Sequence, residues 1–230
     1  MTRCLPRGRL GILGGTFDPI HYGHLDCADA ARDALALDEV VLIPAYDQPL
    51  RTNATQAAAS QRFAMASLAV AGRDGYRVSD LELRREGRSY TADTLRALHE
   101  NGWTALQLFF ILGSDAFAGI AAWHGFPRFL DLAHFVVIAR PGTTIESATA
   151  RAPELRSRMC EVAPGRAVSV DSPRIFLVNA QTRDVSSTMI RARLAASRTI
   201  DDLVPTAVAQ YIVEHHLYGA VGRLHGQERT

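Results

Sequence analysis

The sequence predicts an α/β fold in which a doubly wound parallel sheet carries helices on both faces. Short apolar runs alternate with segments of helical spacing, which is the pattern of βαβ units. The chain has 230 residues, of which 47% are hydrophobic, enough for the core of one domain. No repeat, low-complexity tract or Pro/Gly-rich linker divides the chain. We therefore expect a single domain over residues 1–219 and a flexible tail over residues 220–230.

The expected strands are short, apolar and closed by turn-forming residues. In chain order they cover residues 10–13, 39–44, 76–80, 106–112, 135–139 and 174–179. β-Branched residues, leucines and aromatic residues dominate them. Residues 106–112 are apolar except for one glutamine and end at Gly113, so this stretch is the best candidate for the centre of the sheet.

Helical spacing of apolar residues fills segments between these strands. The expected helices begin near Gly23 and then cover residues 57–71, 89–100, 154–160, 186–196 and 205–216. Asn101-Gly102 is a stop signal for the helix before it. Ser186 stands at a cap position, and Pro205 stands at the start of the last helix.

All 25 basic residues are arginine, and the chain contains no lysine. A Walker-type phosphate loop and a protein kinase both need a lysine on the phosphates. Schiff-base and pyridoxal chemistry need a lysine amine as nucleophile. These classes are therefore excluded, whether the bias is functional or genomic.

Charge and cysteine usage limit the remaining classes. The net charge is +1 and both signs are spread along the chain, so no basic stripe indicates nucleic-acid binding. The apolar runs fall short of the ~20 residues that a membrane span needs. Cys4, Cys27 and Cys160 suit neither a disulfide framework nor a metal knuckle, so we expect a reducing, cytoplasmic location.

Residues 14–24 have the composition of a phosphate-binding loop. Gly14 and Gly15 allow the backbone to approach a phosphate closely, and Thr16 adds a hydroxyl. His21 and His24 are three apart at an expected helix start, so both imidazoles lie near the positive end of its dipole.

Gly23, between the two histidines, leaves space for a bound group. Two alternatives are a plain strand-to-helix turn and a metal-binding histidine pair. No carboxylate or cysteine stands at a helical position that would complete a metal site. The composition of the whole loop favours a polyphosphate.

A second anion site is expected near residue 186. Ser186, Ser187 and Thr188 bring hydroxyls and backbone N–H groups to a helix N-terminus. Arg191 follows one turn later and can direct two donors to the same phosphate. Alone, this pattern would favour a capped helix with an exposed arginine. With the first motif present, it favours the anion site.

Together the two motifs resemble those of the nucleotidylyltransferase superfamily, which have the forms (T/H)xGH and ISSTxIR. From Leu10 to about Gly219 the chain is most similar to the bacterial nicotinate-mononucleotide adenylyltransferases. Residues 79–95, the Gly113-Ser114-Asp115 segment with Trp123 eight residues beyond Asp115, and residues 140–142 also fit that family. The resemblance implies a Rossmann-like version of the predicted fold.

The resemblance implies transfer of AMP from ATP to nicotinate mononucleotide, giving deamido-NAD and pyrophosphate in NAD biosynthesis. ATP and nicotinate mononucleotide are the expected partners, with Mg²⁺ carried on the ATP phosphates and no metal ligand among the protein side chains. No nucleic acid or membrane is expected. The sequence leaves the oligomeric state open, a homodimer included.

The resemblance also implies a role for each matching residue. The expected catalytic residues are His21, His24, Thr16 and Arg191. The expected ATP-binding residues are Gly14, Gly15, Gly23, Gly113, Asp115, Ser186, Ser187 and Thr188. The expected mononucleotide-binding residues are Phe17, Arg51, Tyr90, Thr91, Trp123 and Arg140.

One loop departs from the family pattern. The family usually has Pro-Pro-His-Lys after its second strand, whereas this chain has Gln48-Pro49-Leu50-Arg51. Arg51 supplies a charge in place of the lysine, but arginine and lysine differ in geometry and reach.

Three alternatives remain open from the sequence. Pantetheine-phosphate adenylyltransferases share the segment from Thr16 to His24 but are shorter. A preference for nicotinamide mononucleotide is the second alternative, because that substrate differs from nicotinate mononucleotide only by an amide in place of a carboxylate. A silent nucleotide sensor would be expected to lose His21, His24 or Arg191, and all three are present. A dehydrogenase is disfavoured because Gly14-Gly15 lacks the GxGxxG spacing.

Overall fold

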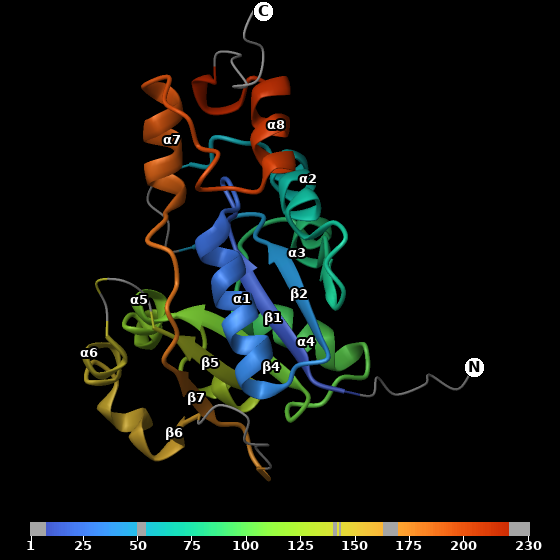
Figure 1. Cartoon of the computed structure of the whole chain (residues 1–230). Coiled ribbons are helices and arrows are strands. Elements are labelled where there is room, and N and C mark those ends of the chain that lie inside the picture. The colour runs from blue at the N-terminus through green and yellow to red at the C-terminus, as the bar shows by residue number, and fades with distance from the viewer. Residues whose placement is uncertain (1–7, 50–53, 140–141, 143, 163–169, 221–230) are drawn as a thin grey trace, which may run out of the picture.

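Seven parallel strands form one sheet at the centre of the molecule (Figure 1). The computed structural model describes residues 8–49, 54–139, 142, 144–162 and 170–220. The strands are β1 (Leu10–Gly15), β2 (Glu39–Pro44), β3 (Tyr76–Val78), β4 (Leu108–Gly113), β5 (His134–Ile138), β6 (Met159–Glu161) and β7 (Ile175–Val178). Their order is β3-β2-β1-β4-β5-β7-β6, and every pairing is parallel. The predicted parallel sheet is confirmed, and its central strand comes from the predicted stretch. The strand β4 begins at Leu108 rather than at residue 106 and ends at Gly113.

Helices occupy the connections between the strands. The α-helices are α1 (Tyr22–Leu35), α2 (Ala59–Val70), α3 (Leu81–Arg85), α4 (Thr91–Glu100), α5 (Ser114–Phe117), α6 (Ile145–Thr149), α7 (Ser187–Ala195) and α8 (Thr206–Glu214). The 3-10 helices are η1 (Ile120–Ala122), η2 (Arg128–Asp131), η3 (Pro153–Arg158) and η4 (Leu217–Gly219). Figure 1 shows α1 lying across one face of the sheet, with α2, α7 and α8 gathered toward one end.

The sheet separates two apolar cores, because successive side chains of a strand point to opposite faces. Leu13 and Ile111 pack with α1, α2, α7 and α8 on one face. Ile12 and Phe110 pack with α4 and the short helices around α5 and α6 on the other. The expected helices on both faces are therefore present.

The structure differs from the sequence prediction in the region after β5. A helix over residues 154–160 was expected, but η3 occupies Pro153–Arg158 and the chain then enters β6. The helix prediction was wrong at Met159 and Cys160, which pair with Ile175 and Phe176 of β7. A three-residue edge strand is too short to produce a period-two pattern, so its identity depends on pairing with β7. Helices α3, α5 and α6 were also not predicted.

The topology marks the place where a ligand is expected. The chain runs outward from β1 to β2 and β3, then returns to β4 on the other side of β1. Connections diverge at this switch point, which leaves a crevice beyond the carboxyl ends of β1 and β4.

Two further expectations concern the ends of the chain and the membrane. The boundary expected at Gly219 stays a prediction, because residues 221–230 lie outside the described part. Within the described residues, no helix has the length and apolar character to cross a membrane.

Candidate active site

A cavity of about 510 Å³, here called the phosphate-side cavity, lies at the carboxyl ends of β1 and β4. The residues expected from the sequence that line it are Gly14, Gly15, Thr16, Phe17, Gly23, His24, Thr91, Gly113, Asp115, Trp123, Ser187, Thr188 and Arg191. A second cavity of about 570 Å³, here called the aromatic-side cavity, shares Gln48, Thr91, Asp115 and Trp123 with the first. The two cavities are therefore adjacent parts of one site.

His24 reaches the phosphate-side cavity and His21 lies behind it. His24 is half-buried and lines the cavity, whereas His21 is only 2% exposed and is not part of the lining. The two imidazoles stack with centroids 3.7 Å apart. The backbone N–H of His21 donates to Nδ1 of His24 at 3.3 Å, so the proton of the neutral His24 ring is on Nε2. His24 thus has the tautomer of a phosphate donor.

Glycines in the first loop are required by close contacts. A Cβ on Gly15 would lie 2.8 Å from the ring of Phe17, which is itself buried at a φ of 52°. A Cβ on Gly23 would lie 3.1 Å from Nδ1 of His21 and 3.3 Å from the carbonyl oxygen of Arg183. Phe17 in turn packs edge-on against His24, with centroids 5.0 Å apart. Side chains at these glycines would displace the histidines.

Asp18 is a buried carboxylate that the sequence analysis did not identify. It is 1% exposed and accepts backbone N–H bonds from Gln56 and Ala57, both at 3.0 Å. The hydroxyl of Tyr218 donates to the same carboxylate at 2.8 Å. Burial, with the charge and hydrogen bond of Asp18, raises the pKa of Tyr218, which keeps this hydroxyl protonated. The first loop is thereby tied to the α2 connection and to η4.

Arg62 of α2 is a second buried residue that the sequence analysis missed. It is 1% exposed and donates to the carbonyl oxygens of Thr16 at 2.7 Å, Ala45 at 2.6 Å and Tyr46 at 3.2 Å. It therefore joins the loop after β1 to the loop after β2. A signal was present, because Arg62 lies in the same helical stripe as Met65 and other buried apolar residues.

The first turn of α7 borders the phosphate-side cavity. Ser186 is the N-cap, and its side chain accepts the N–H of Met189 at 3.1 Å, as its predicted cap position implies. Ser186 itself is not in the lining. The hydroxyl of Ser187 donates to the carbonyl of Pro19 at 2.8 Å. The N–H groups and dipole of this turn make it suited to an anion.

Arg191 connects α7 to the first loop from the next turn. Its Nη1 donates to the carbonyl oxygen of Asp18 at 2.6 Å, and its Nη2 donates to the hydroxyl of Thr188 at 3.2 Å. The guanidinium is half-buried and lines the cavity. The two motifs predicted from the sequence therefore meet in space.

Three ring-bearing residues, Tyr90, Trp123 and His124, line the aromatic-side cavity. Trp123 is half-buried, edge-on to Phe110 at a centroid distance of 6.1 Å and nearly parallel to Phe129 at 6.0 Å. Tyr90 packs on His124 at 4.3 Å, and both line this cavity. A planar ligand would find a ring surface here.

Glu82 was not identified from the sequence, although it lines the phosphate-side cavity. It is 7% exposed and accepts a hydrogen bond from the hydroxyl of Thr94. Burial raises the pKa of Glu82, partly offset by hydrogen bonds from Thr94 and Ser89. The buried carboxyl thereby ties α3 to the start of α4.

Two expected site residues, Arg51 and Arg140, lie outside the described residues. In the part of the chain that the structure describes, no group of three or more His, Cys, Asp or Glu side chains is arranged to hold a metal ion. The phosphate-side cavity instead presents N–H, hydroxyl, imidazole and guanidinium groups beside two carboxyls. Apart from the two carboxyls, these groups can donate hydrogen bonds to an anion.

Comparison with known proteins places this geometry in a family. A sequence model of the family described as cytidylyltransferase-like matches residues 12–193, which include both motifs. The chain belongs to the cytidylyltransferase-like family. The match runs from β1 to the second turn of α7, and so spans the strands and helices that border the phosphate-side cavity.

Two relatives of this cytidylyltransferase-like chain, from different bacteria, carry the same name. A protein from Roseiflexus sp. (strain RS-1), named "Probable nicotinate-nucleotide adenylyltransferase", is 44% identical over 209 residues, which is 91% of this chain and 97% of the relative. A protein of the same name from Pseudomonas aeruginosa (strain UCBPP-PA14) is 41% identical over 92% of this chain and 98% of its own.

Solved structures support the same fold. The Plasmodium falciparum nicotinic acid mononucleotide adenylyltransferase complexed with NaAD has a TM-score of 0.70 at 21% identity, covering 93% of this chain and 98% of that one. The same Plasmodium enzyme complexed with APC has a TM-score of 0.68. The cytidylyltransferase-like chain therefore has the Rossmann-like fold that its sequence resemblance implied.

Proposed function

We propose that this protein is a nicotinate-nucleotide adenylyltransferase, which transfers AMP from ATP to nicotinate mononucleotide and releases pyrophosphate. The observation that carries the proposal is the meeting of His24, Arg191 and the first turn of α7 around one cavity that Trp123 also lines. A relative with this activity in its name is 44% identical over 97% of its own length. A nucleotidyltransferase of NAD biosynthesis is the function that both lines of support share.

The phosphate-side cavity takes the ATP triphosphate in this proposal. Backbone N–H groups at Ser187 and Thr188, with the dipole of α7, bind phosphate oxygens. Nε2–H of His24 donates to a phosphate, and the guanidinium of Arg191 contributes charge. The ring of His21 stacks on the ring of His24 and so helps to hold it in place. A hydrogen bond from His21 itself to a phosphate stays a prediction.

The reaction is one displacement at the α-phosphorus of ATP. An ionised phosphate oxygen of the mononucleotide forms the new P–O bond, and the bond to the bridging oxygen breaks to release pyrophosphate. The attacking oxygen carries no proton, so no general base is required. The enzyme must hold two anions together and stabilise the charge that develops on the leaving group.

The aromatic-side cavity takes the pyridine nucleotide in this proposal. Trp123 offers a ring face to the pyridine, while Tyr90 and Thr91 line the same space. Asp115 lines both cavities, and we assign it to a ribose hydroxyl. The roles expected for Arg51 and Arg140 stay predictions.

Magnesium enters as part of the substrate, Mg·ATP. Most of the polar side chains that line the phosphate-side cavity can donate hydrogen bonds, and the described residues hold no group of three or more side chains arranged to bind a metal ion. We therefore propose that the ATP phosphates hold the ion, where it neutralises charge on the leaving pyrophosphate. We also place the reaction in the cytoplasm, in keeping with the few scattered cysteines.

The test is pyrophosphate release from Mg·ATP with each of three acceptors: nicotinate mononucleotide, nicotinamide mononucleotide and phosphopantetheine. We expect the highest kcat/KM with nicotinate mononucleotide. Preference for phosphopantetheine would overturn the choice of acceptor. Silence with all three acceptors, together with ATP binding, would support a nucleotide sensor instead.

A further inference from the structure

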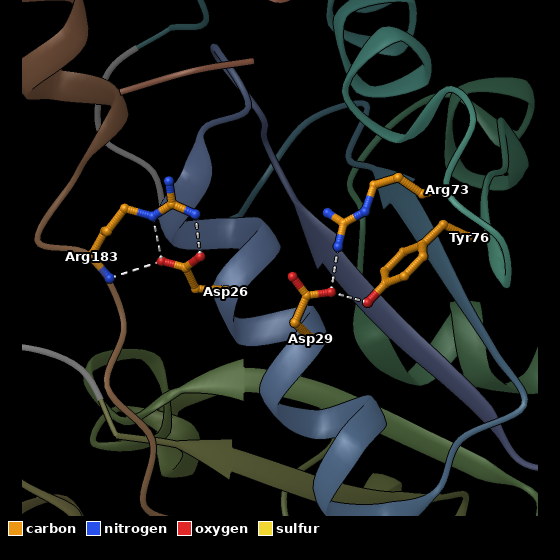
Figure 2. A network of polar contacts seen from close by, with 5 residues as sticks. All are labelled: Asp26, Asp29, Arg73, Tyr76 and Arg183. Atoms are coloured by element: carbon orange, nitrogen blue, oxygen red, sulfur yellow. Dashed lines mark hydrogen bonds and ion pairs between the residues drawn. The ribbon is translucent and has the colours of Figure 1, made fainter. Parts of the chain in front are cut away.

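Two acidic residues on one helix hold it to two different parts of the molecule (Figure 2). Asp26 of α1 pairs with Arg183, which lies between β7 and α7. Asp29, less than one turn further along, bonds to Arg73 and to the hydroxyl of Tyr76. Arg73 and Tyr76 belong to the α2–β3 region, away from both cavities. Of these two pairs, the Asp26–Arg183 pair is the one that lies beside the segment between β7 and α7, which leads to the phosphate-side cavity.

Arg183 is held at several points. Its Nε and Nη2 donate to the two carboxylate oxygens of Asp26 at 3.0 and 2.7 Å, and its backbone N–H donates to Oδ2 at 2.9 Å. The guanidinium carbon also lies 3.9 Å from the ring centroid of Tyr22. Tyr22 and Asp26 are four residues apart, so they share one face of α1 and together bind the arginine.

The position of Arg183 affects the first turn of α7. Residues 179–186 form neither helix nor strand, so pairing in the sheet does not fix their path. The Arg183 carbonyl lies against Gly23, where a Cβ would come within 3.3 Å, and it accepts the N–H of Val185 at 3.0 Å. Ser186 then caps α7 one residue after the buried Val185. The ion pair therefore fixes the position of the backbone at Arg183, where the chain leads into the first turn of α7.

The Asp26 carboxylate is ionised under ordinary conditions. Its side chain is only 16% exposed. Burial raises its pKa, but the hydrogen bonds and charge of Arg183 outweigh this effect and hold the pKa below its usual range. The pair is therefore charged at neutral pH.

We propose that Asp26 and Arg183 are positioning residues that hold the first turn of α7 against His24 in the geometry needed for the ATP phosphates. The inference rests on the proposed function and deepens it. Ser187 and Arg191, which lie within α7, bond to the first loop and hold the helix itself. Arg183 holds the segment that precedes α7. Removing the Arg183 side chain leaves the contacts of Ser187 and Arg191 in place, so the fold persists. The first turn of α7 then becomes less well positioned.

The structure provides a matched control on the same helix. Arg183→Ala and Asp26→Asn remove the pair near the site, and Arg73→Ala and Asp29→Asn remove the pair away from it. Each variant is assayed as the full chain for kcat, for the KM of ATP and of nicotinate mononucleotide, for ATP affinity by titration calorimetry, and for Tm. Partly exposed ion pairs contribute little to stability, so all four variants should show similar small decreases in Tm.

The two pairs should differ in catalysis. Misplacing a binding group by about 1 Å can cost about 10²-fold, so Arg183→Ala should lower kcat/KM for ATP by about 10-fold to 10²-fold. Its ATP affinity should fall while the KM of the mononucleotide stays near the wild-type value. Arg183→Lys should recover part of the loss, because a lysine replaces the charge without the fork. Arg73→Ala and Asp29→Asn should leave these parameters at wild-type values.

Wild-type ATP parameters in Arg183→Ala would overturn the inference. An equal loss in Arg73→Ala would also overturn it, because the effect would then come from general destabilisation. If the wild-type protein fails to use nicotinate mononucleotide, the proposed function is wrong, and the ATP affinities of the four variants still test the role of the pair.

Discussion

The phosphate-side cavity is held by buried polar contacts, whereas the aromatic-side cavity is formed by packed rings and exposed groups. Asp18 and Arg62 are each 1% exposed and connect the first loop to α2. The side chain of Trp123, by contrast, packs on the rings of Phe110 and Phe129, with ring centroids 6.1 and 6.0 Å apart. Buried hydrogen bonds impose one geometry, while packed rings accept small adjustments. Phosphate chemistry needs the first property, and recognition of a planar ring tolerates the second.

The comparison predicts that the largest catalytic loss comes from the phosphate side. His24→Ala removes a donor from the cavity and should lower turnover by about 10²–10³-fold, the usual cost of losing one such donor. The measurement is kcat for pyrophosphate release at saturating substrates. His215→Ala, at an exposed histidine outside both cavities, is the control and should keep wild-type turnover. Near-normal turnover in His24→Ala would remove the basis for the proposed reaction.

Stability should also respond most strongly on the phosphate side. Arg62→Met leaves three carbonyl oxygens without their donor, each worth about 1 kcal/mol or more, so the free energy of unfolding should fall by about 3 kcal/mol or more. Urea unfolding measures the change. Exposed Arg84, which pairs with Asp80 one turn away, provides the control Arg84→Met, expected to change stability by less than about 1 kcal/mol. Equal effects in the two variants would contradict the rigid role given to Arg62.

On the aromatic side we expect a change in binding rather than in turnover. Trp123→Ala removes a stacking surface worth about 1–3 kcal/mol, so the KM of the mononucleotide should rise about 10-fold while kcat and the KM of ATP change little. Trp103→Phe is the control, because Trp103 packs on the same core without lining either cavity. A loss of kcat as large as that in His24→Ala would show that the two sides are not separable.

The smallest expected effect concerns pH and Glu82. Burial raises the pKa of Glu82, so its favourable contribution to stability is present below the unfolded value of 4.5 and is lost as pH rises through the folded pKa. Glu82→Gln keeps an oxygen that can accept from Thr94 but does not ionise. The variant should therefore gain Tm over the wild type at about pH 8 and not at about pH 4. Parallel Tm–pH curves for the two proteins would show that Glu82 is not destabilised by ionisation.

Much of the fold and the phosphate side could be predicted from the sequence because the signals are local. The run at β2 and the cap at Ser186 match the structure, since each depends on a few adjacent residues. The meeting of the two motifs followed from the parallel sheet, which brings carboxyl ends of strands to one edge.

The missed features depend on contacts between distant parts of the chain. Arg183 and Asp26 are 157 positions apart, and the residues next to each of them in the sequence do not predict the pair. β6 exists through its pairing with β7 and has no pattern of its own. Arg62 lies in an apolar stripe, but only the structure shows which carbonyl oxygens it binds.

The hydrogen bond from Tyr218 to Asp18 joins positions 200 residues apart. Proteins are synthesised from the N-terminus, and domains fold as their residues emerge. The first loop is therefore made 200 positions before the tyrosine that donates to its carboxylate. Until Tyr218 has been made, Asp18 lacks one of the hydrogen-bond donors that hold it. The final geometry of the first loop is thus completed only after α7 and α8 have been synthesised.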